Sequence, residues 1–423
     1  MSKGRWATSF SGRVIPWAAI TALALSAGCS EGSGPSPRDR DSLPPALSLS
    51  QISAGNYSSC GLSPAGAAYC WGAGRAGELG AEPPENCGGD PGEFPCATAP
   101  IELGETLTHI DVGGQHACGL RDSGSIVCWG DGTHGQLGGP PPVSNCSPVS
   151  TGCARLPQLV PLEGQAVTLS AGGSHTCVLD PAGIATCWGY NQGGRLGTGD
   201  VTTRFEPTPV TTDLRFIAIA AGGTHTCAIA EDGRAYCWGY NHLGQLGDGS
   251  VDSRRLPTPV ATELRFRDVV TGVAHSCART EEGAAYCWGA AGEGQLGTNA
   301  PLDTCEGGYY ACSLIPGPVV GGHAFTALSA DRFTCGVGLG GSFCWGPSPT
   351  NTSSVPVAMR SEGLTGRVFI RIDVGSEHAC GVTEDSLAYC WGSDYQGTLG
   401  DGPAEGGPEP ALVREPVDSV RSL

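Results

Sequence analysis

The stretch that decides the fold runs Gly222-Gly223-Thr224-His225-Thr226-Cys227, then Asp232-Gly233, Tyr236-Cys237-Trp238-Gly239 and Gly244-Gln245-Leu246-Gly247. Altered copies of this unit bring the total to seven. Their Cys-Trp-Gly segments begin at Cys70, Cys128, Cys187, Cys237, Cys287, Cys344 and Cys390. Successive copies are therefore 58, 59, 50, 50, 57 and 46 residues apart, and no helical spacing of apolar residues separates them. A period near fifty without helices indicates repeated β-sheets.

Each unit has the pattern of a β-hairpin. Residues alternate with period two, so Cys227 and Ile229 share one face, while Tyr236 and Trp238 share another. Asp232-Gly233 supplies the turn. A short strand such as 216–219 precedes the hairpin, and a Pro-x-x-Val-like edge such as 207–210 precedes that strand. Four strands in each of seven units predict an all-β fold, a seven-bladed β-propeller of four-stranded blades, over residues 46–423.

The full pattern is Gly-x-x-His-x-Cys, Gly-x-x-Tyr-Cys-Trp-Gly and Gly-Gln-Leu-Gly. It resembles the repeat of the regulator of chromosome condensation family, whose members form seven-bladed β-propellers. Gly-Gln-Leu-Gly recurs at 135–138, 244–247 and 294–297, with looser versions at 77–80, 194–197 and 397–400. The sixth unit departs, because Gly346-Pro347-Ser348-Pro349 replaces the tetrapeptide and Phe333 replaces the histidine.

The two ends of the chain predict how the ring closes. The first unit begins at Leu47-Ser48-Leu49 with little before it, whereas the last continues into Pro410-Ala411-Leu412-Val413. This C-terminal segment matches the edge strand of a further repeat that never arrives. We therefore expect the C-terminal strand to complete the first blade and to hide the edges that an open array would leave unpaired.

The 21 cysteines divide without remainder into Cys29, seven repeat pairs and three additional pairs. In a repeat hairpin the two cysteines are equidistant from the turn, so they face each other within disulfide range. In the sixth unit, a two-residue turn at Leu339-Gly340 still leaves its pair opposed. Disulfides are the prediction for an exported chain, and buried free thiols are the alternative. The repeat pairs are Cys60–Cys70, Cys118–Cys128, Cys177–Cys187, Cys227–Cys237, Cys277–Cys287, Cys335–Cys344 and Cys380–Cys390.

The additional pairs, Cys87–Cys96, Cys146–Cys153 and Cys305–Cys312, bracket insertions in the three longest intervals. All three insertions follow the Gly-x-Leu-Gly stretch, so a closed propeller would place them on one face. The third insertion contains Glu306, Tyr309 and Tyr310, which are the candidate binding residues because stapled, exposed tyrosines lose little entropy on contact. The alternative is that the insertions are tolerated surface loops.

Residues 1–28 resemble the signal peptide of a bacterial lipoprotein. Three basic residues precede an apolar stretch, 14–25, that is too short to remain as a membrane span. The segment Ser26-Ala27-Gly28-Cys29 resembles a lipobox, which implies cleavage before Cys29 and lipidation of its sulfur. That family prefers a large aliphatic residue where Ser26 stands, so ordinary secretion is the alternative. Residues 29–45 are predicted to form a flexible tether, and the expected location is the bacterial outer membrane or cell surface.

Neither the composition nor the motifs predict catalysis. The formal net charge of −18 repels phosphate backbones, and no basic stripe for nucleic acid is present. No nucleophile elbow, zinc-protease motif or phosphate-binding loop occurs. We predict no catalytic residues, no cofactor and no metal site. The motif histidines are expected to satisfy local backbone groups, with a metal-binding ring as the alternative, and the repeated tryptophans are expected to pack between blades. These histidines are His116, His175, His225, His275 and His378.

These observations favour a binding or scaffold propeller over an enzyme. We expect a monomer, anchored at the cell envelope by its lipid, that recognises a protein or a glycan through the stapled loops on one face. A secreted inhibitor of a hydrolase such as a β-lactamase is the first alternative, because a bacterial β-lactamase inhibitor uses a similar propeller. A propeller lyase or glycosidase is the second, with only fold-level precedent.

Overall fold

The computed structural model of the chain describes residues 44–87, 94–140, 145–147, 150–359, 367–394, 396–402 and 407–416. The predicted signal segment, Cys29 and the tether up to residue 43 lie outside these residues. Every described residue belongs to one compact unit, Pro44–Leu423. Among the described residues, no helix has the length and apolar character needed to cross a membrane.

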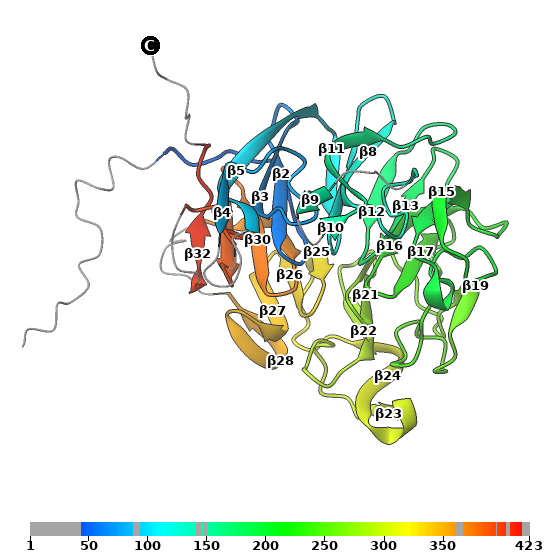
Figure 1. Cartoon of the computed structure of the whole chain (residues 1–423). Helices are drawn as coiled ribbons and strands as arrows, with labels where there is room; N and C mark the ends of the chain where they lie inside the picture. The colour runs from blue at the N-terminus through cyan, green and yellow to red at the C-terminus, as the bar shows by residue number, and fades with distance from the viewer. Residues whose placement is uncertain are drawn as a thin grey trace, which may run out of the picture. The chain divides into compact units, whose positions relative to one another are not determined.

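Seven antiparallel sheets, called blades I–VII, follow one another along the chain (Figure 1). Blade I consists of β1 (Gln51–Ala54), β2 (Ser58–Leu62), β3 (Ala67–Ala73) and β5 (Phe94–Thr106), with β4 (Glu85–Cys87) as a fifth strand. Blade II consists of β6 (His109–Val112), β7 (His116–Leu120), β8 (Ile126–Asp131) and β11 (Cys153–Leu159). A separate ribbon joins β9 (Asn145–Ser147) to β10 (Ser150–Thr151). Blade III consists of β12 (Thr168–Ala171), β13 (His175–Leu179), β14 (Ala185–Gly189) and β15 (Arg204–Pro209), with the short 3-10 helix η1 (Gln192–Gly194) before β15.

The remaining four blades repeat this order. Blade IV consists of β16 (Phe216–Ala221), β17 (His225–Ala230), β18 (Ala235–Gly239) and β19 (Arg254–Pro259). Blade V consists of β20 (Asp268–Thr271), β21 (His275–Arg279), β22 (Ala285–Ala290) and β24 (Tyr310–Pro318), with β23 (Asp303–Cys305) as a fifth strand and η2 (Glu306–Gly308) between β23 and β24. Blade VI consists of β25 (Phe325–Ala330), β26 (Thr334–Gly338), β27 (Gly341–Ser348) and β28 (Asn351–Ala358). Blade VII consists of β29 (Phe369–Val374), β30 (His378–Thr383), β31 (Ala388–Gly392) and β32 (Gly407–Leu412).

The first strand of each blade lies at the centre of a ring. Strand β1 contacts β6, and the contacts continue in turn through β12, β16, β20, β25 and β29, which contacts β1 again. The sheets are therefore arranged as the blades of a closed propeller (Figure 1). The predicted all-β, seven-bladed architecture with four-stranded blades is confirmed.

The second and third strands of every blade form the stapled hairpin. In blade IV, Cys227 pairs directly with Cys237 across the ladder, and their Cα atoms are 4.1 Å apart. In blade VI the hairpin is one residue shorter, but Gly338 pairs with Gly341, so Cys335 still faces Cys344. All seven repeat pairs are disulfide-bonded in the structure.

The tryptophan that follows each second cysteine joins its blade to the preceding one. Trp238 of blade IV is fully buried and packs in one cluster with Leu196 and Val210 of blade III. The other six repeated tryptophans are equally buried. Because an indole buries a large apolar area, each contact contributes strongly to cohesion between blades. This arrangement agrees with the packing role expected from the sequence.

The C-terminal strand closes the ring, as predicted, but its ladder partner is β31, so β32 is the outer strand of blade VII and joins the first repeat through that repeat's opening residues. The N–H of Leu47 donates to the carbonyl of Val413, and Ala46 forms a bridge with Arg414. Leu47, Leu49 and Val413 share a core cluster. The strand pairing also shows where one repeat ends and the next begins. β32 pairs with β31, and in every blade the outer strand likewise pairs with the hairpin that precedes it in the sequence. The opening residues of the first repeat are thus joined to the sheet that the C-terminal strand completes.

Candidate functional site

Two sets of connections emerge on one face of the propeller, which we call the insertion face. They follow the first strand of each blade, as at 172–174, and the third strand, as at 190–203. They share a face because successive strands of a blade are antiparallel. The hairpin turns, such as 180–184, lie on the opposite face. All three additional cysteine pairs follow a third strand, so all three insertions lie on the insertion face.

Each insertion is closed by a disulfide. Cys87–Cys96 and Cys305–Cys312 fasten the fifth strands β4 and β23 to their blades, and Cys146–Cys153 fastens the ribbon to blade II. The Cα separations are 5.7 to 6.1 Å. Two of the three insertions therefore extend a blade sheet outward instead of forming free loops.

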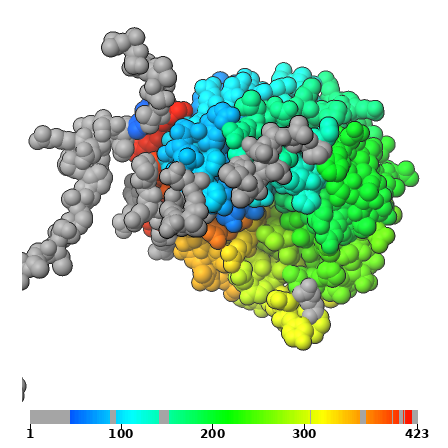
Figure 2. Space-filling model, viewed as in Figure 1, coloured from blue at the N-terminus to red at the C-terminus, as the bar shows by residue number. Residues whose placement is uncertain are grey.

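The blade V insertion presents the candidate binding residues. Strands β23 and β24 project from the ring in Figure 1, and the same segment stands out in Figure 2. Tyr309 is 86% exposed and Tyr310 is 55% exposed, whereas both cysteines of the staple are buried. Glu306 opens η2, but its side chain lies outside the described residues. The structure thus brings the two tyrosines to the tip of a fixed hairpin.

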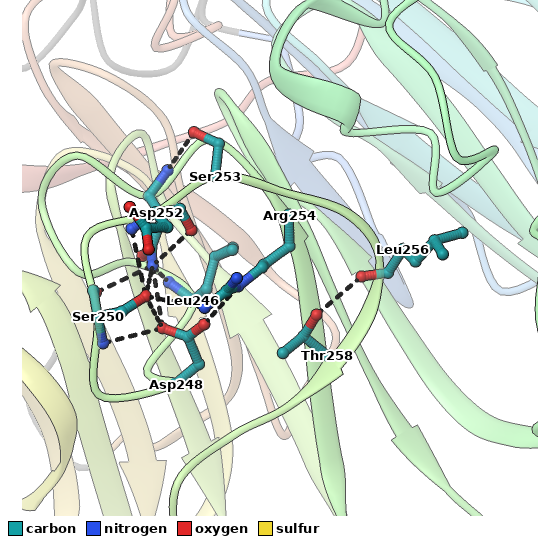
Figure 3. A network of polar contacts seen from close by, with 9 residues as sticks. Leu246, Asp248, Ser250, Asp252, Ser253, Arg254, Leu256 and Thr258 are labelled. Carbon is teal, nitrogen blue, oxygen red and sulfur yellow. Dashed lines mark hydrogen bonds and ion pairs between the residues drawn. The ribbon is translucent and has the colours of Figure 1, made fainter.

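The insertion-free blades III and IV carry long loops held by buried amides. In blade IV the Nδ2 of Asn241 donates to Asp248 Oδ1 at 3.1 Å and to the carbonyls of Ser250 and Asp252 at 3.0 and 3.1 Å. Figure 3 shows this network, in which Arg254 pairs with Asp248. Burial works to raise the pKa of Asp248, but hydrogen bonds from Ser250 and Arg254 outweigh it and leave the pKa below its usual value. These loops form an ordered part of the insertion face.

The motif histidines link neighbouring blades. His175 Nε2 lies 2.8 Å from Thr226 Oγ1, and that hydroxyl donates to the carbonyl of Arg195 at 2.8 Å. The hydroxyl has one hydrogen, so His175 must donate from Nε2. Burial lowers the pKa of His175 well below its usual value, and its buried Nδ1 has no partner among the described residues, so the ring is neutral. This set of a histidine, a hydroxyl and a carbonyl is called the blade latch. The expectation that the histidines satisfy local backbone groups was wrong, because their Nε2 partner is a side chain of the next blade.

The blade latch occurs five times and fails twice, and the failures match across blades. Further pairs are His116–Thr176, His225–Ser276, His275–Thr334 and His378–Ser59, with Nε2 to hydroxyl distances of 2.7 to 2.9 Å. Where Ser58 and Phe333 replace the histidine, the facing residues of the next blade are Ala117 and Ala379. A hydroxyl is therefore present only where a histidine faces it.

Half-buried carboxylates link neighbouring blades around the central channel. Asp373 accepts hydrogen bonds from the N–H of Ala54 at 2.8 Å and from Ser329 at 2.7 Å. Asp111 likewise accepts from the N–H of Ala171 and from Ser53. The channel has a volume of about 470 Å³. Because both oxygens of each carboxylate are engaged, the two groups hold blades together and do not form a free acid–base pair.

Burial governs the titration of these groups. Desolvation raises the pKa of Asp111, Asp331 and Asp373 to about 6, although their side chains keep partial exposure to the channel. The same effect lowers the pKa of His116 and His378 to about 4. The histidines of the blade latch are therefore neutral at pH 7.

The described residues contain one cluster of three potential metal ligands, Glu85, Cys87 and Cys96. Its two cysteines form a disulfide, so their sulfurs are not thiolates and cannot serve as ligands. The blade latch histidines are each bonded to a different blade. The cluster and the histidines thus provide structural links.

Comparison with known proteins places the chain in a family. A model of the RCC1-like domain matches residues 6–306, and a model of the regulator of chromosome condensation (RCC1) repeat matches residues 369–398. The probable E3 ubiquitin-protein ligase HERC3 of Homo sapiens is 29% identical over 215 residues, which are 50% of this chain and 19% of that protein. The mitochondrial RCC1 domain-containing protein RUG3 of Arabidopsis thaliana is 29% identical over 168 residues, 38% of this chain and 33% of that protein. The chain thus spans a third or less of the length of these two eukaryotic relatives.

Solved structures support the same fold. Human WBSCR16 superposes with a TM-score of 0.69 at 21% identity, covering 83% of this chain and 96% of that one. Prp20p from Saccharomyces cerevisiae superposes with a TM-score of 0.56 at 19% identity, covering 86% and 76%. At these identities the likeness shows the fold alone, but the first family model spans well over half of the chain. The chain therefore belongs to the RCC1-like domain family.

Proposed function

We propose that this propeller is a protein-binding module whose insertion face contacts the partner, with the blade V hairpin as the principal contact. The observation that carries the proposal is the position of Tyr309, 86% exposed at the tip of a hairpin stapled by Cys305–Cys312. An aromatic side chain held in water by a rigid hairpin gains apolar burial when a partner covers it.

The surroundings of the tyrosines favour a protein partner. Leu302, which precedes β23, and Ile315 of β24 are 41% and 49% exposed on the same blade. Aromatic anchors with apolar neighbours are typical of the energetic centre of protein interfaces. Because the staple fixes the hairpin before contact, little conformational entropy is lost on binding.

One structural relative supports the choice of a protein as partner. The yeast protein RCC1 (Prp20), which shares this fold at 19% identity, has been solved bound to another protein, Kap60. That observation concerns the yeast protein. It supports protein binding as a use of the fold and does not identify a partner for this chain.

The test compares two surface variants in crosslinking pull-downs from the native source. Tyr309→Ser/Tyr310→Ser should lose the captured partner while keeping the thermal stability of the natural protein. Leu339→Ser is the matched control, because Leu339 is 93% exposed in a hairpin turn of blade VI, on the opposite face. Equal capture by the double variant and the natural protein would refute the proposal.

We also propose that the propeller is anchored to an envelope membrane by a lipid on Cys29. The lipobox-like segment before Cys29 supports the proposal. Metabolic labelling with a radioactive fatty acid should mark the natural protein and leave Cys29→Ser unlabelled and released from membranes. Equal labelling of both proteins would show that Cys29 is not the acceptor.

A further inference from the structure

Blade VI lacks the loop that every other blade has on the insertion face. In blade IV, residues 240–253 separate β18 from β19. In blade VI, β27 and β28 are joined by a two-residue turn, because Ser348 pairs with Asn351. The missing segment is the one that contains Gly-x-Leu-Gly elsewhere.

The other blades show what this loop does. In blade IV, Leu246 is fully buried, and the Gln245 carbonyl accepts hydrogen bonds from Ser276 Oγ and Trp288 Nε1 of blade V at 2.9 and 3.0 Å. The corresponding leucines of five further blades are at most 4% exposed: Leu79, Leu137, Leu196, Leu296 and Leu399. Each loop therefore inserts a leucine and presents a carbonyl to the blade that follows.

A notch of about 400 Å³ lies between blades VI and VII, on the insertion face. Pro347 and Pro349 of the shortened hairpin line one side, and Gly392 and Ser393 of blade VII line another. Arg332 and Glu377 form an ion pair at 4.0 Å at the notch. These residues lie in the connections after the first and third strands, which the Gly-x-Leu-Gly loops cover in the other blades.

The junction below the notch lacks the usual polar partners. Phe333 and Ala379 replace the histidine and hydroxyl of the blade latch. Trp391 Nε1 is buried without a hydrogen-bond partner among the described residues. Trp238 and Trp345 share that property, but each lies beneath a loop glycine, Gly197 or Gly297, less than 3 Å from where a Cβ would stand. No glycine of that kind is found against Trp391 in the described part of blade VI.

We propose that the notch between blades VI and VII is a docking site for a turn of a partner protein that replaces the missing Gly-x-Leu-Gly loop. The turn would place a leucine against the prolines and present its backbone to the rim between Arg332 and Ser393. This inference rests on the proposed protein-binding function and names the chemistry of one contact. The notch is continuous with the insertion face, and its neighbour blade V carries Tyr309.

The experiment uses the chain's own loop as the probe. A fluorescein-labelled peptide of residues 240–253 is titrated with the full-length protein, and fluorescence anisotropy is measured. We expect saturable binding that weakens at least tenfold when the peptide carries Leu246→Asp. Binding that is absent, or equal for the two peptides, would overturn the inference.

Two protein variants locate the site. Ser393→Phe, which fills the notch from its rim, should weaken binding of the peptide at least tenfold. A second variant, with residues 347–350 replaced by the sequence of 240–253, should abolish binding and should be at least as stable as the natural protein. Undiminished binding by a folded form of either variant would overturn the proposed site.

A third variant separates this inference from the proposed function. Tyr309→Ser/Tyr310→Ser should bind the peptide like the natural protein, because its substitutions lie on another blade. Retained peptide binding with unchanged partner capture would remove the hairpin proposal and leave the notch in place. If the double variant loses the partner but neither it nor the natural protein binds the peptide, the notch proposal is refuted and the hairpin proposal stands.

Discussion

His378 of blade VII and Ser59 of blade I are 319 residues apart in the sequence, yet Nε2 of the histidine lies 2.7 Å from Oγ of the serine. Ser59 also donates to the carbonyl of Thr398 at 3.2 Å, and Trp71 donates to the same carbonyl at 3.0 Å. One carbonyl of blade VII thus accepts from two side chains of blade I. This is the point at which the blade latch closes the ring.

Removing one hydroxyl of the blade latch should destabilise the propeller. Thr226→Ala leaves the buried N–H of His175 without a partner, and an unsatisfied buried donor typically costs about 1–3 kcal/mol. Chemical denaturation should show this loss in the free energy of unfolding. The paired variant His175→Ala/Thr226→Ala should lose less than the sum of its single variants, with a coupling of about 0.5–3 kcal/mol. Strict additivity would show that the pair is not coupled.

The blade latch histidines should make the protein less stable in mild acid. Burial lowers the pKa of His275 to about 4 and that of His225 to about 3, whereas an unfolded histidine titrates near 6.5. Their contribution is fully present above pH 6.5 and is lost as the pH falls towards the folded pKa, with a slope approaching about 1.4 kcal/mol per pH unit for each histidine. His225→Gln, which keeps a donor but does not titrate, should reduce this slope between pH 6.5 and 4.5. An unchanged slope would contradict the assignment.

The channel carboxylates should act in the opposite direction. Burial raises the pKa of Asp373 to about 6 from an ordinary value of 3.8. A carboxyl with a raised folded pKa favours folding below its unfolded pKa, and that contribution is lost as the pH rises through 6. Asp373→Asn should therefore gain stability relative to the natural protein between pH 4 and pH 7, measured by denaturant unfolding at each pH. A relative loss over that range would show that the carboxylate is stabilised by its contacts more than it is penalised by burial.

Deleting residues 407–423 should open the ring. The deletion removes β32 and the fully buried Val413, and it breaks the hydrogen bond between Leu47 and Val413. We expect a lower melting temperature and a broader transition by calorimetry. Deleting only residues 417–423, which leaves β32 and Val413 in place, is the matched control. Identical melting of the longer deletion and the natural protein would refute closure by this strand.

The two classes of disulfide should have different effects. Cys227→Ala/Cys237→Ala removes a buried staple at the centre of a blade, and we expect a loss of about 2–3 kcal/mol in the free energy of unfolding. Cys305→Ser/Cys312→Ser frees only the projecting hairpin, so global stability should change by less than about 1 kcal/mol. The second variant should nevertheless weaken partner capture, because the tyrosines lose their fixed positions. Equal destabilisation by both variants would place the blade V hairpin in the folding core.

The cysteine pairing could be predicted because it depends on local geometry. Cys118 and Cys128 are ten residues apart on one hairpin, and their ladder partners follow from the position of the turn alone. The placement of Tyr309 on the insertion face followed in the same way, from the order of antiparallel strands. Both depend on contacts within one repeat.

The contacts between blades could not be assigned in that way. The register of His175 against Thr226, or of Asp373 against Ala54, depends on how far one sheet is displaced and rotated relative to the next. A signal was nevertheless present. In each unit, the residue that follows the position of the motif histidine is a threonine or a serine wherever the preceding unit has a histidine. It is Ala117 or Ala379 where the preceding unit has none.

The sequence by itself determined the repeat number, the hairpin, the staples and the presence of three insertions, because each arises from residues close together along the chain. Only the tertiary structure decided to which blade each histidine is bonded, how the carboxylates link the blades around the channel and where the shortened blade VI leaves a notch. Those features arise from contacts between residues that are 44 to 319 positions apart in the sequence, where close packing and the desolvation of polar groups select a single register.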